Sequence, residues 1–175
     1  MTLRSKLPRR PQPSSIPSKA MAILLTLLAA LLPVHAWAAT ATTTFTVSAT
    51  VLSICTVAAL PLNFGNYDPT SGSALDGTTT VTATCTLSLP YTIGLDNGVN
   101  ASGSQRRMAL LTAFLNYELY KDASRTQRWG NSGAELASGT GNGLAQNLTV
   151  YGRVAGGQAV AAGAYVDVIT VTITF

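Results

Sequence analysis

The sequence predicts an all-β protein with a single sandwich domain. Apolar residues and Thr or Ser alternate along several short segments, which is the pattern of half-buried strands. Clusters of Gly, Pro, Asn and Asp separate these segments, as turns do. Charged residues make up only 10% of the 175 residues, and the long helix formers Lys, Glu and Gln are scarce.

Six segments show the alternation, and each is expected to form a strand. They are residues 44–51, 80–86, 91–95, 115–120, 147–151 and 169–175. Turns are expected at residues 68–69, 76–77, 96–98, 130–133, 139–143 and 156–157. In the stretch 105–115, Met108, Leu111 and Leu115 fall at helical spacing, which indicates a helical turn. Six or seven short strands favour a β-sandwich of immunoglobulin-like type, with a closed barrel as the alternative.

The first 38 residues have the three parts of a secretory signal. Residues 1–20 hold five basic residues and no acidic one, and residues 20–32 form an apolar run. Ala36 and Ala38 are the small residues of a cleavage site. The run is shorter than the roughly 20 residues of a membrane-spanning helix, which disfavours an anchor. We expect export and removal of residues 1–38, with Met21 as the alternative start.

Removal of the signal changes the charge of the chain. The whole sequence has 11 Lys and Arg against 7 Asp and Glu, a formal net charge of +4. Five of the basic residues leave with the signal, so residues 39–175 keep six against seven acidic residues, a net charge of −1. The basic character therefore belongs to the targeting segment, and it does not indicate binding of nucleic acid.

Cys55 and Cys85 are the two cysteines of the chain. In an exported protein such a pair favours a disulfide. Zinc is the competing use, but a zinc site needs three or four ligands, and residues 39–175 contain no histidine. We expect a disulfide and no metal.

No group of residues typical of a catalytic site is complete. A nucleophile has no histidine base once His35 is removed, and Lys121 is expected to be a solvated surface charge. Asp68, Asp76 and Asp96 stand in turn motifs, where an Asp side chain bonds its own backbone. A secreted hydrolase that uses two carboxylates is therefore the least favoured function. We expect no enzyme activity, no cofactor and no small-molecule substrate.

The first and last expected strands of residues 39–175 carry no charge. The apolar positions of the first are Phe45, Val47, Ala49 and Val51. Those of the last are Ile169, Val171, Ile173 and Phe175. Uncharged edge strands pair readily with other chains, and most proteins protect them with Lys, Pro or bulges. Either both strands pair within their own sheet, or the first is donated to a neighbour whose sheet lacks a strand; the residues alone favour neither.

A series of short pieces across residues 43–175 resembles the spore coat protein U domain family, which includes subunits of archaic chaperone–usher pili. The pieces are Cys-x-Val at 55–57, Leu-Asn-Phe-Gly-Asn-Tyr at 62–67, Val-Thr-Ala-Thr-Cys at 81–85, Pro-Tyr-Thr-Ile-Gly-Leu-Asp-Asn-Gly at 90–98, Arg-Met at 107–108, Leu-Asn-Tyr-Glu-Leu-Tyr-Lys-Asp at 115–122, Trp-Gly at 129–130, Tyr-Gly-Arg-Val at 151–154 and Ala-Gly-Ala-Tyr-Val-Asp at 162–167. Their order and spacing carry the resemblance, since no single piece is specific.

The resemblance implies an immunoglobulin-like sandwich that is incomplete because its last strand is missing. A periplasmic chaperone fills the resulting groove first, and the N-terminal strand of the next subunit replaces it at an outer-membrane usher. Residues 39–52 would be the donor strand, with Phe45, Val47, Ala49 and Val51 as its plugs, and residues 53–175 the domain. Ile169, Val171, Ile173 and Phe175 would border the acceptor groove. Cys55 and Cys85 match the family's disulfide.

The function that the resemblance implies is that of a secreted structural pilus subunit with a role in surface attachment or biofilm. It passes through the periplasm to the cell surface and polymerises by donor-strand complementation with other pilus subunits. A shaft or adaptor subunit is expected, because the chain has no room for a receptor-binding domain. The alternative is a self-contained secreted coat or matrix protein.

Four residues are expected to pack in the core or at corners: Arg107, Tyr120, Trp129 and Tyr165.

Overall fold

A computed structural model gives the fold of residues 37–175. The predicted signal, residues 1–38, lies outside the described residues except for its last two. Residues up to Ser48 and residues from Ala49 to Phe175 form two separate units, which are described one at a time. None of the helices in the described part has the length and apolar character needed to cross a bilayer.

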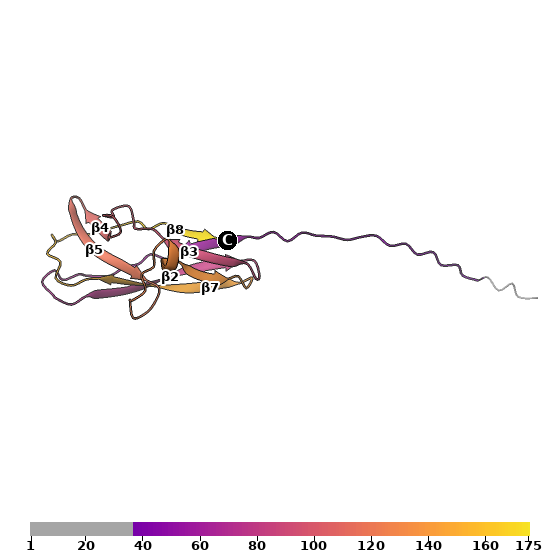
Figure 1. Cartoon of the computed structure of the whole chain (residues 1–175), viewed down its shortest axis with the longest axis horizontal. Helices are drawn as coiled ribbons and strands as arrows, with labels where there is room; N and C mark the ends of the chain where they lie inside the picture. The colour runs from indigo at the N-terminus through magenta and orange to yellow at the C-terminus, as the bar shows by residue number, and fades with distance from the viewer. Residues whose placement is uncertain (1–36) are drawn as a thin grey trace, which may run out of the picture. The chain divides into compact units, whose positions relative to one another are not determined.

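The part from Ala49 to Phe175 is built from two antiparallel sheets (Figure 1). The five-stranded sheet has the order β1 (Cys55–Ala59), β2 (Leu75–Cys85), β7 (Ala145–Val154), β5 (Ala113–Tyr120) and β4 (Arg106–Leu110). The three-stranded sheet has the order β6 (Ala137–Thr140), β3 (Pro90–Leu95) and β8 (Val171–Thr174). One short 3₁₀ helix, Gly133–Glu135, completes the regular structure of the described residues. The predicted all-β class is confirmed.

The core follows from the alternation seen in the sequence. In the second half of β2, along β3 and from Leu115 onward in β5, every second residue points inward, and each of these side chains is 5% exposed or less. They are Val81, Ala83, Cys85, Tyr91, Ile93, Leu95, Leu115, Tyr117 and Leu119. Their neighbours in sequence are mostly hydroxyl or polar residues that face solvent. The period of two therefore places the apolar half of each strand between the two sheets.

The disulfide between Cys55 and Cys85 is confirmed. The two residues are directly paired in the register of β1 and β2, and they are separated by 30 positions in the sequence. The bond fixes the first strand of the sandwich at the edge of the five-stranded sheet.

Replacement of both cysteines by Ala is expected to lower the free energy of unfolding by about 3–4 kcal/mol, because the unfolded chain regains the entropy of a 30-residue loop. Urea unfolding of the full chain and of the double variant, followed by tryptophan fluorescence, measures the difference. Equal stability of the two proteins would contradict the expectation.

Two predicted elements are wrong. Residues 105–115 hold no helical turn, because they form β4, β5 and the tight connection between them. Leu111 occupies that connection with a φ of 54° and an exposed side chain, so its helical spacing from Met108 has no structural meaning. Residues 76–77 are not a turn but part of β2, where Asp76 pairs with Arg153 across the sheet.

The strand predicted over residues 44–51 is absent from the described structure, which assigns no regular element before β1. The side chains of Phe45, Val47 and Val51 are 81–85% exposed. Three strands that the alternation did not mark are present instead: β1, β4 and β6.

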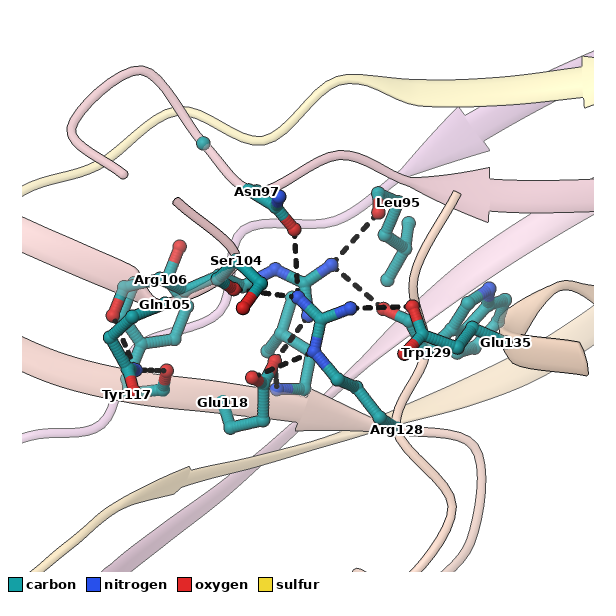
Figure 2. A network of polar contacts seen from close by, with 12 residues as sticks. Leu95, Asn97, Ser104, Gln105, Arg106, Tyr117, Glu118, Arg128, Trp129 and Glu135 are labelled. Carbon is teal, nitrogen blue, oxygen red and sulfur yellow. Dashed lines mark hydrogen bonds and ion pairs between the residues drawn. The ribbon is translucent and has the colours of Figure 1, made fainter. Parts of the chain in front are cut away.

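A buried charged cluster joins the two sheets (Figure 2). Arg106 of β4 is 0% exposed, and its Nη2 donates to the carbonyls of Leu95 in β3 and of Trp129, at 2.8 and 2.7 Å. Its Nη1 forms an ion pair with Glu118 of β5. Burial lowers the pKa of Arg106, and the charge of Glu118 opposes that effect. One side chain therefore holds β3, β4, β5 and the loop at Trp129 together.

A second arginine extends the cluster toward solvent. Arg128 donates from Nε to Glu118 at 2.9 Å and from Nη1 to Glu135 at 2.6 Å. The indole of Trp129 is buried beside it and donates to the carbonyl of Ile93 at 3.0 Å. Each arginine charge thus has a carboxylate partner, which a charge removed from water requires.

Candidate strand-acceptor groove

The last strand has one free edge. Among the described strands β8 pairs only with β3, from Leu95 opposite Val171 to Thr92 opposite Thr174. The pairing continues before β8 in a less regular form, because the amide of Val99 donates to the carbonyl of Val168 at 3.2 Å. The backbone groups on the opposite edge of β8 are therefore available to another strand.

A cavity of about 380 Å³ lies beside this edge. One wall is the chain that follows β1, residues 59–64, and the other is the chain that leads into β8, residues 165–171. Its floor consists of core side chains of both sheets: Val81, Leu95, Tyr117, Leu119 and Val150. The cavity is thus unfilled space against the core of the sandwich, and the side chains of its floor are themselves 1–5% exposed.

A second cavity, of about 770 Å³, continues the first. The two share Leu62, Phe64, Met108, Tyr165 and Val166 in their walls. The second extends over Leu75, Leu115 and Val154 of the five-stranded sheet. We call the two cavities together the β8 groove.

The groove exists because loops, and no strand, cover one half of the five-stranded sheet. Residues 62–67 and 160–166 face each other over the sheet in this half. Leu62 and Phe64 lie close to the sheet because β7 has a glycine there: a Cβ on Gly152 would stand 2.6 Å from Leu62 Cδ2 and 2.7 Å from Phe64 Cζ.

Gly152→Ala is expected to destabilise the chain by about 1–3 kcal/mol, because the added methyl group forces Leu62 and Phe64 away from the sheet. Gly72→Ala is the matched control, since a Cβ at Gly72 meets nothing within 4 Å. Urea midpoints of both variants measure the effect. An equal shift of the urea midpoint in the two variants would show that contact with Leu62 and Phe64 is not the reason why position 152 requires glycine.

Two carboxylates hold the groove wall that leads into β8. Asp167 accepts a hydrogen bond from the hydroxyl of Tyr117 at 2.7 Å, and the amide and side chain of Asn100 donate to it at 3.1 and 3.0 Å. Burial raises the pKa of Tyr117, so this phenol stays a donor. Asp96 accepts from the amides of Thr170 and Gly98 at 2.9 and 3.0 Å.

Burial acts to raise the pKa of Asp96, but the hydrogen bonds from Thr170 and Gly98 outweigh it and lower the pKa. A carboxylate with a lowered folded-state pKa stabilises the fold above its unfolded pKa, near 4, and this stability is lost as the pH falls through the folded value. We expect the urea concentration at the unfolding midpoint to decrease when the pH is lowered below about 4. The decrease is expected to be smaller in Asp96→Asn than in the unmodified chain. Identical acid sensitivity of the two proteins would contradict this.

The predicted groove residues fall into two groups. Ile169 and Val171 line the first cavity. Ile173 packs against the core and Phe175 is exposed, and neither lies in the wall of the β8 groove. Ala49 is exposed like Phe45, Val47 and Val51. The donor and acceptor roles of these residues stay predictions.

The environments of five further residues agree only in part with the predictions from the sequence. Trp129 is in the core as expected, whereas Tyr165 is half buried and lines both cavities. The guanidinium of Arg107 stacks on Phe114 at 4.0 Å, and Tyr120 is half buried. Lys121 is not a free surface charge, because its Nζ donates to the carbonyls of Ala134 and Leu136.

Sequence and structure comparisons place the chain among known proteins. The family model described as Spore Coat Protein U domain matches residues 41–172. Protein U of Myxococcus xanthus is 38% identical over 155 residues, which cover 79% of this chain and 87% of that protein.

Among solved structures, the chain is similar to a chain of the CsuC–CsuE chaperone–tip adhesion subunit pre-assembly complex from the archaic chaperone–usher Csu pili of Acinetobacter baumannii. The TM-score is 0.56 at 27% identity over 72% of this chain. The chain spans 40% of the length of that solved chain.

Proposed function

The chain belongs to the Spore Coat Protein U domain family, and on that premise we propose that it is a secreted structural subunit of a chaperone–usher-type pilus. One observation carries the proposal. The β8 groove is lined by core side chains such as Val81, Leu119 and Val150 and lies beside the free edge of β8. A strand supplied by another protein fills the groove and completes the sandwich.

The N-terminal segment of a neighbouring copy is the proposed strand. Residues 39–52 are uncharged, and their alternate residues Phe45, Val47, Ala49 and Val51 are all exposed in the described chain. In the groove these four plugs lose contact with water, and full burial of a Phe or Val side chain contributes about 1.5–3 kcal/mol. Ile169, Val171, Ile173 and Phe175 border the acceptor edge in this proposal.

The proposed partners follow from the same groove. Before assembly a periplasmic chaperone occupies it, and an outer-membrane usher is the place where the next subunit replaces the chaperone. The similar solved structure supports the first step, because it is a complex of a chaperone with a pilus subunit. The assembled protein stands at the cell surface and serves attachment or biofilm formation.

Gel electrophoresis of the assembled full chain tests the proposal. Without boiling, a strand-exchanged polymer gives a ladder of bands that collapses to a monomer on heating. A single monomer band before and after heating would overturn the proposal and favour a self-contained secreted coat or matrix protein.

A further inference from the structure

The loop between β6 and β7 lies at an end of the sandwich whose segments carry no charged side chains. The amide of Gly143 in this loop donates to the carbonyl of Cys85 at 3.1 Å. The amide of Ser88 donates to the carbonyl of Gly141 at 2.8 Å, so the loop packs beside the disulfide and the turn that follows β2. Four segments meet here and contain no Asp, Glu, Lys or Arg: residues 49–67, 77–95, 136–152 and 168–175.

The loop contains Asn142, which is followed by glycine. Both Asn142 and Gly143 are exposed. The φ of Gly143 is 79°, and a Cβ on it would meet no atom within 4 Å beyond its chain neighbours, so the space around this residue is open. The side chain of Asn142 folds back on its own backbone, because its Oδ1 accepts a hydrogen bond from the amide of Leu144 at 2.9 Å. The carboxamide is thus held close to the backbone of the glycine.

An asparagine followed by glycine can lose its side-chain amide through attack by the backbone. The amide nitrogen of Gly143 bonds to Cγ of Asn142 and closes a succinimide ring. The bond from Cγ to Nδ2 breaks, and the hydrogen given up by the Gly143 nitrogen leaves with the side-chain NH₂ as ammonia. Water then opens the ring at one of its carbonyls, which yields aspartate or isoaspartate. Glycine favours the attack because it has no Cβ to obstruct the approach.

The hydrogen bonds of the loop act on this reaction in opposite directions. Negative charge develops on Oδ1 of Asn142 during the attack, and the amide of Leu144 already donates to this atom, which stabilises that charge. The bond from Gly143 to the carbonyl of Cys85 opposes the reaction, because the attacking nitrogen has to leave it first. Hydrogen bonds of an exposed loop open at little cost in free energy. We therefore expect the reaction to be slow but to proceed in the folded protein.

The chain has a second Asn-Gly pair, Asn97 and Gly98, and the fold restrains it. Oδ1 of Asn97 accepts a hydrogen bond from Nη2 of Arg128 at 2.7 Å. The amide of Gly98 donates to the carboxylate of Asp96 at 3.0 Å. A Cβ on Gly98 would stand 1.9 Å from Oδ2 of Asp167, so the space around this glycine is filled. The same two residue types thus form an open pair in one loop and a restrained pair in another.

We propose that Asn142 is a site of spontaneous deamidation, through which the folded protein acquires a carboxylate at its uncharged end. This inference is independent of the proposed function. The product has eight acidic residues in 39–175 where the unmodified chain has seven, against six basic ones, so the formal net charge changes from −1 to −2. The new carboxylate adjoins Leu144, which is 70% exposed. An exposed apolar end therefore becomes charged as the protein ages, which makes it less favourable for apolar partners to cover.

Peptide mapping of the aged protein tests the proposal. The full chain, with its disulfide intact, is kept for several weeks in mildly alkaline buffer, and is then unfolded and digested with trypsin. Asn142 is released in the peptide 129–153, whereas Asn97 lies in a separate peptide that ends at Arg106. We expect mass spectrometry to find aspartate and isoaspartate at position 142 and an unchanged Asn97. An unchanged Asn142, or equal conversion at the two positions, would overturn the proposal.

Two controls tie the result to the fold and to this side chain. In urea both Asn-Gly pairs are expected to deamidate, and an Asn97 that stays intact in urea would overturn the claim that the fold protects it. Isoelectric focusing of the aged protein is expected to show an acidic band that is missing from Asn142→Gln, whose longer side chain has to close a larger ring. Asn147→Gln, at an exposed asparagine followed by leucine, is expected to keep the band. An equally strong band in Asn142→Gln would overturn the assignment to Asn142.

Discussion

Deletion of residues 39–50 is expected to abolish the heat-sensitive ladder and to leave chaperone-bound monomer. The deletion removes three of the four proposed plugs, Phe45, Val47 and Ala49, and leaves the disulfide and all eight described strands in place. The β8 groove therefore stays intact while the proposed donor strand is lost. Gels of unboiled and boiled samples, with chaperone co-purification, measure the result. A ladder that survives the deletion would show that another segment supplies the strand.

Point variants sharpen the same experiment. Val47→Asp places a carboxylate on the face of the segment that is proposed to enter the groove, and an unpaired buried charge is strongly unfavourable. Thr46→Asp adds the same charge to the opposite face, because successive side chains of a strand point to opposite sides. We expect no ladder from Val47→Asp and an unchanged ladder from Thr46→Asp. Equal effects of the two would show that the segment does not bind as a strand in this register.

Replacement of Arg106 by Met is expected to destabilise the chain by about 3–5 kcal/mol, the range for removal of one partner of a buried ion pair. Arg106 is 0% exposed, and without it the carbonyls of Leu95 and Trp129 lose a donor inside the fold. Such a loss is a large part of the stability of an ordinary domain. Urea unfolding of the full chain gives the difference in free energy.

Arg153→Met is the matched control for that measurement. Arg153 and Asp76 form a two-point ion pair, but their side chains are 41% and 37% exposed. Surface pairs contribute between about 0 and 1 kcal/mol, so this variant should unfold close to the unmodified chain. If Arg106→Met is no less stable than Arg153→Met, the buried cluster does not hold the two sheets together.

The central strands could be predicted because their signal is local. Alternation at 80–86, 91–95, 115–120 and 147–151 finds parts of β2, β3, β5 and β7, whose inward residues form the core. The disulfide could also be predicted, since two cysteines in a chain predicted to be exported leave few alternatives. The helical turn predicted at 105–115 was wrong because Leu111 lies at the tip of a hairpin, and its spacing from Met108 and Leu115 is a coincidence.

The groove and the charged cluster could not be predicted, because their parts come from distant positions. The groove walls around residues 62–67 and 160–166 have no periodic pattern, and only the fold brings them together. The partners of Arg106 lie at Leu95, Glu118 and Trp129, which nothing in the sequence connects. In the sequence, Arg106 stands beside a second arginine, Arg107, and such a pair indicates surface charges. Only the fold shows the buried partners of Arg106.

The pairing order also sets when the chain can fold during the proposed export. The two longest partners, β2 and β7, join Leu75 to Val154, and β3 needs Thr174 to pair with Thr92. In the proposed export, a chain that crosses the inner membrane from its N-terminus completes the five-stranded sheet only after Val154 has arrived, and the three-stranded sheet only after Thr174 has arrived. Non-local pairing of this kind is slow, and it leaves strand edges uncovered for the whole interval. If the chain is exported as proposed, the time that translocation takes therefore adds to the time during which the strand edges of the emerging chain are uncovered.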